Sequence, residues 1–265
     1  MYRPAFKEFA QLADSSGPED AGLVLFCAYY LKTLQDALVE RRALEYCQKH
    51  IDVDDSRQLL DCALALAALH ALPSIRFPNG FSAVALSQKV DLAIKLRINL
   101  RALFNLDQLD SDEFLCHAIT WLFVFERARL TALDPFKERI AQRVKQRRQK
   151  EYRLLTGDGW RWQARLVTTI MYSLCDWGNK SLMDDCVREG EYIRANMATA
   201  VELKDVAVVG DFVLCLARHD YTVVSLPFFK QAQQLLREHV IAENERFFDR
   251  FHTAWCRAMG LRVDH

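Results

Sequence analysis

Glycine and proline are scarce in this sequence, with 9 Gly and 6 Pro among 265 residues. A β-sandwich or β-barrel of many strands needs a turn about every 10 residues, and turns depend on these two residue types. The scarcity therefore excludes a many-stranded β fold. It favours a chain of helices joined by short breaks.

Other features are missing as well. No uncharged apolar window reaches the ~18 residues that a membrane-spanning helix needs. The N-terminal segment MYRPAFKEFAQLADSSGPED has no basic region followed by an apolar core, so we expect no signal peptide. The eight cysteines are scattered singly, without a CxxC pair. We interpret them as reduced, buried thiols of a cytoplasmic protein.

Neither sign of charge is in excess, because Lys+Arg and Asp+Glu both number 35. A dedicated nucleic-acid binder usually carries surplus positive charge, so nucleic acid is not an expected partner. Near neutrality also favours homo-oligomers, since little long-range repulsion keeps copies apart.

One basic stretch departs from this balance. Residues 137–153, KERIAQRVKQRRQKEYR, carry eight basic residues against two acidic ones. We interpret the stretch as a solvated outer helix whose Phe136, Ile140 and Val144 face the core. The alternative is a helix that follows phosphates, with the nearby Trp160 and Trp162 stacking on bases.

Apolar residues recur with the helical period along most of the chain. Six segments are apolar nearly all round and should be inner helices: Glu19–Leu34, Ser56–Leu72, Ser111–Leu130, Gln163–Trp177, Leu203–His219 and Glu245–Leu261. Five more have a charged face and should cover them: Asp36–His50, Phe81–Phe104, Pro135–Leu154, Lys180–Val201 and Leu226–Ile241. Residues 73–80 and 156–159 are expected to be loops, and Gly178 and Gly260 to end helices.

The alternation of inner and outer helices predicts an all-α fold. Paired antiparallel helices would form an α/α barrel or a short α-solenoid, in a single all-helical domain over residues 1–265. We favour the closed barrel because the inner helices carry His, Asp and Trp residues that need a partly polar lumen. An open superhelix is the alternative, and residues 156–159 are the only tenable domain boundary.

Established catalytic and metal-binding signatures are missing, including GxxxxGK[ST], GxGxxG, HExxH and GxSxG. Asp54-Asp55 and Asp184-Asp185 lack the third Asp of a magnesium-binding motif. Cys116, His117 and Cys175 could ligate zinc, but the Trp-Cys and Cys-His-Gly motifs of zinc-dependent lanthionine cyclases are not present. We therefore name no metal ligands, and the residues do not identify a cofactor.

Polar residues inside the apolar helices are the candidates for chemistry. His117, Asp211 and His252 are the predicted catalytic set, because a His–Asp pair on a shared lumen can act as general acid and base. Trp121, four residues after His117 on the same helix face, is predicted to bind ligand together with Asp176 and Trp177. These six residues come from four of the predicted inner helices.

Each of these residues can also be a core residue whose polar atoms bond to a neighbouring backbone group or hydroxyl. A buried carboxylate destabilises the fold unless it is paired. We therefore expect Asp211 to face a donor such as His or Arg.

Three phrases carry a resemblance to a known family. They begin at His117 (HAITWLFVF), Asp211 (DFVLCL) and Phe251 (FHTAW). Over about the last 150 residues the chain resembles an uncharacterised bacterial α/α-repeat family that is often encoded near natural-product genes. The chain has Glu126-Arg127 where that family tends to have Asp and Gly. The resemblance implies an α/α toroid, with no established reaction.

Two functions follow as hypotheses. The first is a toroid-like protein that binds a small molecule or peptide in a central lumen, as a biosynthetic enzyme if the His/Asp set is catalytic. The second is a non-catalytic helical-repeat scaffold that binds a protein partner on its concave face.

Overall fold

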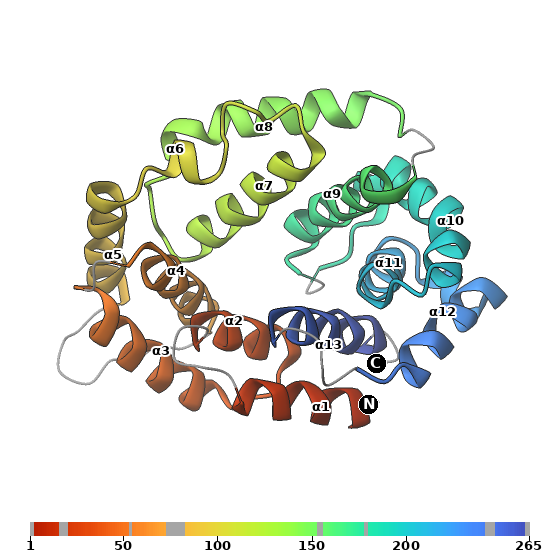
Figure 1. The fold of residues 1–265 in the computed structure, drawn as a ribbon, viewed down its shortest axis with the longest axis horizontal. Helices are drawn as coiled ribbons and strands as arrows, with labels where there is room; N and C mark the ends of the chain where they lie inside the picture. Colours follow the sequence, from red (N-terminus) through yellow and green to blue (C-terminus); the bar gives the residue numbers. More distant parts are fainter. Residues whose placement is uncertain are drawn as a thin grey trace. The chain divides into compact units, whose positions relative to one another are not determined.

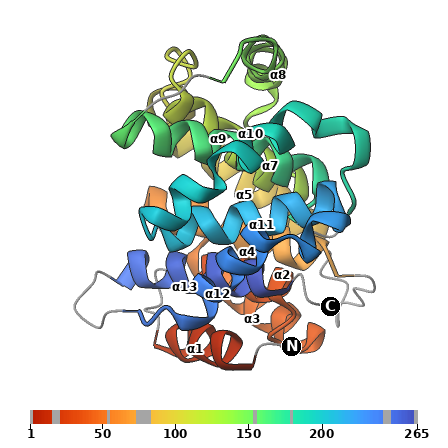
Figure 2. The ribbon, with the colours of Figure 1, turned by 90° about the vertical axis from the view of Figure 1, so that its right-hand side faces the viewer.

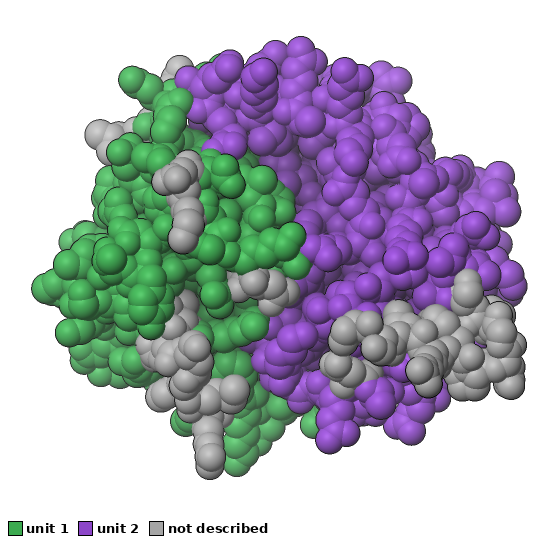
Figure 3. All heavy atoms as spheres, turned by 180° about the vertical axis from the view of Figure 1, so that it is seen from behind, with its two compact units in different colours: residues 1–15, 150–265 green, residues 16–149 purple. Residues whose placement is uncertain are grey.

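The computed structural model describes residues 3–15, 21–52, 55–72, 83–152, 156–177, 180–241 and 247–262. Within these ranges the chain forms thirteen α-helices, two short 3-10 helices and no β-strand. The prediction of an all-α fold built from packed helix pairs is therefore confirmed. The chain divides into two compact units, residues 1–15 with 150–265 (unit 1) and residues 16–149 (unit 2), shown in Figure 3. The predicted single domain over residues 1–265 stays a prediction.

Unit 2 is organised around one buried helix, α4, which packs against α2, α3, α5 and α7 (Figure 1). Alternating Ala and Leu residues in α4 leave little side-chain bulk, so four helices can approach it from different sides. The helices of this unit are α2 (Ala21–Leu31), α3 (Asp36–His50), α4 (Ser56–His70), α5 (Ala83–Arg97), α6 (Leu100–Leu103), α7 (Asp112–Arg127) and α8 (Asp134–Gln149).

The crossing of α2 and α4 depends on a glycine and an aspartate. A Cβ at Gly22 would collide with the backbone carbonyl of Asp61, so only glycine permits this approach. The Asp61 carboxylate accepts hydrogen bonds from the backbone N–H groups of Gly22 (2.5 Å) and Leu23 (2.8 Å). It thereby satisfies donors that the first turn of α2 leaves open.

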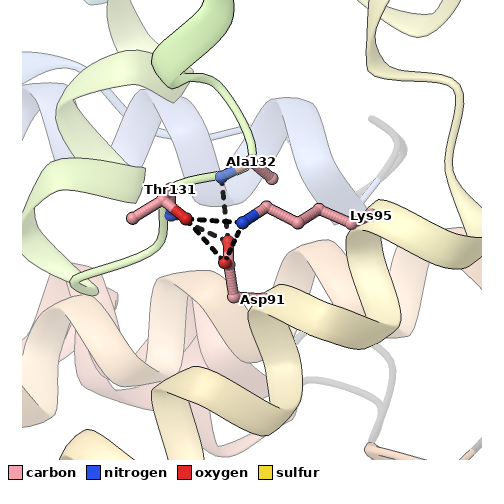
Figure 4. Close-up of polar contacts among 4 residues, drawn as sticks. All are labelled: Asp91, Lys95, Thr131 and Ala132. Carbon is pink, nitrogen blue, oxygen red and sulfur yellow. Dashed lines mark hydrogen bonds and ion pairs between the residues drawn. The ribbon is translucent and has the colours of Figure 1, made fainter.

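A second buried carboxylate holds the link between α7 and α8 (Figure 4). Asp91 on α5 accepts hydrogen bonds from the backbone N–H groups of Thr131 and Ala132 and from the Thr131 hydroxyl, at 2.8 to 2.9 Å. Lys95 pairs with it at 2.6 Å. Burial raises the pKa of Asp91, but the bonds from Lys95 and Thr131 outweigh it, so the pKa lies below its ordinary value.

Unit 1 is organised around α11, which packs against α9, α10, α12 and α13 (Figures 1 and 2). Its sequence VAVVGDFVLCLARH is apolar on nearly every face, as a surrounded helix requires. The elements of this unit are α1 (Arg3–Asp14), α9 (Gly157–Cys175), η3 (Met183–Cys186), α10 (Val187–Glu202), α11 (Val206–His219), η4 (Tyr221–Ser225), α12 (Pro227–Glu238) and α13 (Phe247–Leu261).

The closest helix crossing in unit 1 joins α11 to α13. A Cβ at Gly210 would collide with the backbone of Cys256, and Gly260 on α13 faces Gly210 in turn. Gly260, expected at a helix end, is the second-last residue of α13, where it also permits this contact.

The N-terminal helix α1 was not among the predicted helices. It packs beside α13 (Figures 1 and 2), where Phe9 and Phe251 have ring centroids 5.2 Å apart and Arg257 forms an ion pair with Glu8. Buried Phe9 and Leu12 do follow the helical period. The sequence shows the apolar face of α1, but it does not show that α13 covers this face.

Most predicted helices lie where expected, and Asp36–His50 is matched residue for residue by α3. The predicted loop 156–159 is wrong, because Gly157 begins α9. The predicted helix Phe81–Phe104 is divided into α5 and α6, since the Asn99 side chain accepts a hydrogen bond from the Ala102 N–H and starts a new helix. The predicted loop 73–80 and Gly178 lie outside the described residues.

All eight cysteines are buried, and none forms a disulfide. The prediction that they act as small buried apolar residues is confirmed.

Candidate active site around Tyr172 and Asp211

The predicted site residues are distributed over both units. His117 and Trp121 lie on α7 in unit 2, whereas Asp211 and His252 lie on α11 and α13 in unit 1. Asp176 and Trp177 follow the end of α9, also in unit 1. Unit 1 therefore carries four of the six predicted residues.

In unit 2, Trp121 on α7 packs among other aromatic side chains. The Trp121 ring stacks on Phe104 with centroids 5.5 Å apart and meets Phe125 edge-on at 6.1 Å. Thr120 donates its hydroxyl to the Cys116 carbonyl one turn earlier, at 3.0 Å. His117 is exposed on this helix. Trp121 thus anchors the segment before α7, and its predicted role in ligand binding stays a prediction.

In unit 1 the site is centred on a residue that the sequence did not single out, Tyr172 on α9. Its hydroxyl donates a hydrogen bond of 2.6 Å to Oδ1 of Asp211. The predicted donor for this carboxylate was His or Arg, so the partner is of a different type. A tyrosine satisfies the buried carboxylate without bringing a second charge into the core.

Two tryptophan rings pack with the Tyr172 ring. The Trp177 ring lies parallel to the Tyr172 ring, with centroids 4.8 Å apart and an interplanar angle of 4°. Trp255 from α13 lies 5.2 Å from Trp177 and 6.5 Å from Tyr172, tilted to both. Tyr172 and Trp255 are buried, while Trp177 is half-buried. The cluster therefore reaches solvent on the Trp177 side.

The backbone after α9 folds Trp177 back over Tyr172. Asp176 and Trp177 both have a φ of 51°, in the left-handed region, and the N–H groups of both donate to the Tyr172 carbonyl. A non-glycine residue in this region costs about 1–2 kcal/mol. The stacking of Trp177 on Tyr172 opposes that cost. Asp176 acts here as the helix C-cap, and its predicted part in ligand binding stays a prediction.

Burial controls the protonation of Asp211. It raises the pKa of this carboxyl to about 6, although hydrogen bonds from Tyr172 and Cys256 and the positive charge of Arg165 act in the opposite direction. At neutral pH the group is mainly ionised, and it takes up a proton in mildly acidic solution. Such a value suits a general acid or base that works near pH 6.

His252 is the second ionisable group of the cluster, on α13. Burial, together with the positive charge of Arg165, lowers its pKa to about 4, so the imidazole is neutral at pH 7. Its Nε2 lies 3.5 Å from Sγ of Cys256, one helical turn later. Because Cys256 also bonds to Asp211, the thiol lies between the carboxyl and the imidazole. The order of the two pKa values is thus the reverse of that for free Asp and His.

Sequence reasoning found Asp211, His252 and Trp177 but missed Tyr172, Trp255 and Cys256. A signal for two of them was present, because Trp255 and Cys256 follow His252 by three and four residues and so share its helix face. Tyr172 had no comparable signal, since its partner Asp211 lies 39 residues away.

The basic stretch on α8 is paired rather than open. Arg139, Arg143 and Arg147 bind a row of aspartates, namely Asp107 (3.2 Å), Asp110 (2.9 Å) and Asp112 (2.7 Å). Ile140 is buried, and Phe136 and Val144 are half-buried. This is the arrangement expected of the outer-helix interpretation, and the ion pairs neutralise much of the charge that would attract phosphates.

Among the described residues, no helix is long and apolar enough to cross a membrane. The same residues hold no group of three or more His, Cys, Asp or Glu side chains arranged to bind a metal ion.

Comparison of the chain with protein-family models, with curated proteins and with solved structures found no match. The resemblance to the bacterial α/α-repeat family therefore stays a prediction.

Proposed function

We propose that unit 1 binds a small planar molecule beside Trp177 and Trp255, with Asp211 as the group that exchanges a proton with it. One observation carries the proposal. The indole Nε1 of Trp255 is buried, with only 6% of the residue exposed, and no hydrogen-bond acceptor for it lies among the described residues. A buried donor without a partner calls for an explanation, and an acceptor atom of a bound molecule supplies one.

The chemistry of the surrounding groups fits such a ligand. Half-buried Trp177 offers a ring face for stacking, and planar rings stack on indole at ~0.5–1.5 kcal/mol beyond the area they bury. Asp211 can accept or donate a proton near pH 6, and neutral His252 can accept a hydrogen bond. The participation of His117, which belongs to unit 2, stays a prediction.

The test compares the native mass of the purified full chain with its denatured mass. We expect extra mass from a small molecule in the wild type and its loss in Trp255→Phe, which keeps a ring but removes the N–H donor. Asp211→Asn should lose the bound mass as well. Trp162→Phe is the matched control, since Trp162 is a half-buried tryptophan on α9 and should leave the bound mass unchanged.

Two results would overturn the proposal. One is a clean mass for the wild type purified under gentle conditions. The other is bound mass that persists in Trp255→Phe and Asp211→Asn while circular dichroism shows all variants folded. Either result would direct attention to the second candidate.

The second candidate is a protein-binding scaffold, and an apolar row on α5 favours it. Leu92 and Leu96 lie one turn apart with 59% and 75% of their surfaces exposed, and Val84 extends the row. Because the chain has no net charge, a second copy is the first partner to test. Sedimentation of the wild type should then show a dimer that Leu92→Glu abolishes. A monomer at all concentrations would contradict self-association.

A further inference from the structure

Unit 1 also contains a surface cavity that shares no residue with the Tyr172 cluster. Its volume is about 320 Å³, and its lining includes Glu151, Tyr152, Arg188, Glu191, Tyr192 and Asn196. This volume is at the lower end of the range for small-molecule pockets, ~300–1,000 Å³. It suits a ligand of a few heavy atoms.

One face of α10 forms most of the cavity. Arg188, Glu191, Tyr192 and Asn196 lie at helical spacings of three, four and eight residues from the first, so they line up along one side of the helix. Residues 151–152, before α9, supply the rest. The position of α10 is shown in Figure 2.

Two tyrosines form an aromatic corner in this cavity. The rings of Tyr152 and Tyr192 have centroids 5.1 Å apart and an interplanar angle of 52°. The Tyr152 hydroxyl donates a hydrogen bond of 2.9 Å to the carboxylate of Glu189, which is 1% exposed. This bond fixes the ring in place. The face of a tyrosine ring attracts a cation through its π quadrupole.

Asn196 is held rigidly beside the aromatic corner. Its Oδ1 accepts a hydrogen bond of 2.9 Å from the indole of Trp160, and its Nδ2 donates one of 2.9 Å to the Tyr192 carbonyl. Trp160 and Asn196 are both buried. The side chains on this side of the cavity are therefore held in position before any ligand binds.

The ionised groups at the cavity favour positive charge. Glu151 and Glu191 are exposed at the lining, and Arg188 is the cation among the lining residues. Arg188 directs Nη2 to the Lys150 carbonyl at 3.1 Å, and Glu189 adds a third carboxylate behind Tyr152. Carboxylates close to the two tyrosine rings add to the attraction for a cation.

From this combination we infer that the cavity binds a small organic cation, an alkylammonium group seated in the cavity against the Tyr152 and Tyr192 side chains and neutralised by Glu151 and Glu191. The inference is independent of the function proposed for the Tyr172 cluster.

Calorimetric titration of the full chain with choline tests this inference. The matched probe is 3,3-dimethylbutan-1-ol, which has the shape of choline without its charge. We expect choline to bind and the neutral alcohol to bind at least fivefold more weakly, about 1 kcal/mol. Equal binding of the two, or no binding of choline, would overturn the inference.

Variants identify the cavity as the binding place. Glu191→Gln removes a charge at the lining and should weaken choline binding about fivefold. Tyr152→Leu should weaken it at least as much. Glu202→Gln, an exposed glutamate on the same helix, is the control and should change nothing. Asp211→Asn should also leave choline binding intact, which separates this site from the Tyr172 cluster. Equal effects of Glu191→Gln and Glu202→Gln would contradict the assignment.

Discussion

The Tyr172 hydroxyl donates a 2.6 Å hydrogen bond to Asp211, a carboxyl whose pKa burial raises to about 6. The two influences oppose each other. Burial in a low-dielectric interior favours the protonated carboxyl, whereas a donated hydrogen bond favours the ionised one. Their balance places the proton equilibrium of Asp211 within the range where a side chain can serve as both acid and base.

Tyr172→Phe should raise the pKa of Asp211 above 6, because it removes a hydrogen bond to the ionised form. Loss of the bond should also lower the free energy of unfolding by about 1–3 kcal/mol. Carbon NMR of the Asp carboxyls against pH and urea unfolding measure the two effects. Tyr221→Phe is the control, since Tyr221 is 68% exposed. A pKa that stays or falls in Tyr172→Phe would show that the bond does not favour ionisation.

Asp211→Asn should destabilise the protein more at pH 4 than at pH 7. Between the unfolded pKa of ~3.9 and the folded value of about 6, the folded state holds a proton that the unfolded state has lost. The stability that Asp211 contributes therefore falls as pH rises through this window, by about 2–3 kcal/mol. Asn does not ionise and shows no such fall. Urea unfolding of the wild type and Asp211→Asn at pH 4 and pH 7 measures this difference. An equal loss of unfolding free energy at both pH values would contradict the raised pKa.

His252→Gln should show the opposite pH dependence. The folded pKa of His252 is about 4, below the unfolded value of ~6.5, so the unfolded state binds an extra proton between these values. Wild-type stability is therefore lost as pH falls from 6.5 towards 4. The substitution should therefore lower the free energy of unfolding less at pH 4 than at pH 7. We expect a difference of about 2 kcal/mol, less than the full pKa shift would give, because the ring is only half-buried. A larger cost at pH 4 would exclude a depressed pKa.

Asp91→Ala should destabilise unit 2 strongly, because Thr131 and Ala132 lose the acceptor that holds the α7–α8 link. We expect a loss of about 2–3 kcal/mol, as for other buried groups left without partners. The lowered pKa of Asp91 means that its contribution is present above the unfolded pKa and disappears as pH falls through the folded one. Asp110→Ala breaks an exposed ion pair and should cost less than about 1 kcal/mol by thermal unfolding. Similar costs for both would contradict the structural role of Asp91.

Gly22→Ala and Gly210→Ala should each lower the free energy of unfolding by about 3 kcal/mol or more, because the added methyl group would meet backbone atoms of a crossing helix. Gly157→Ala has open space around it and only the strain of a positive φ, so about 1 kcal/mol is expected. Urea unfolding separates the two classes. If all three variants cost the same, the helix crossings are looser than described.

The placement of helices could be predicted from the sequence to within a few residues for most elements. Periodicity and scarce Gly and Pro are local properties, and a helix such as Asp36–His50 depends mainly on them. Helix α1 was missed because its amphipathic pattern is short and its stability comes from packing on α13. The break between α5 and α6 was missed because one side-chain cap decides it.

The sequence by itself determined that this protein is all-α and that its cysteines are buried. It also determined that Asp211 and His252 interrupt apolar helices, that Trp177 ends one, and that these side chains need polar or aromatic partners. Only the tertiary structure decided which residues those partners are. Tyr172 reaches Asp211 across 39 residues, and Trp255 and Cys256 approach from α13. The reason is physical: helix formation depends on neighbours within about four residues, whereas the pKa of a buried carboxyl depends on whichever side chains packing brings to it.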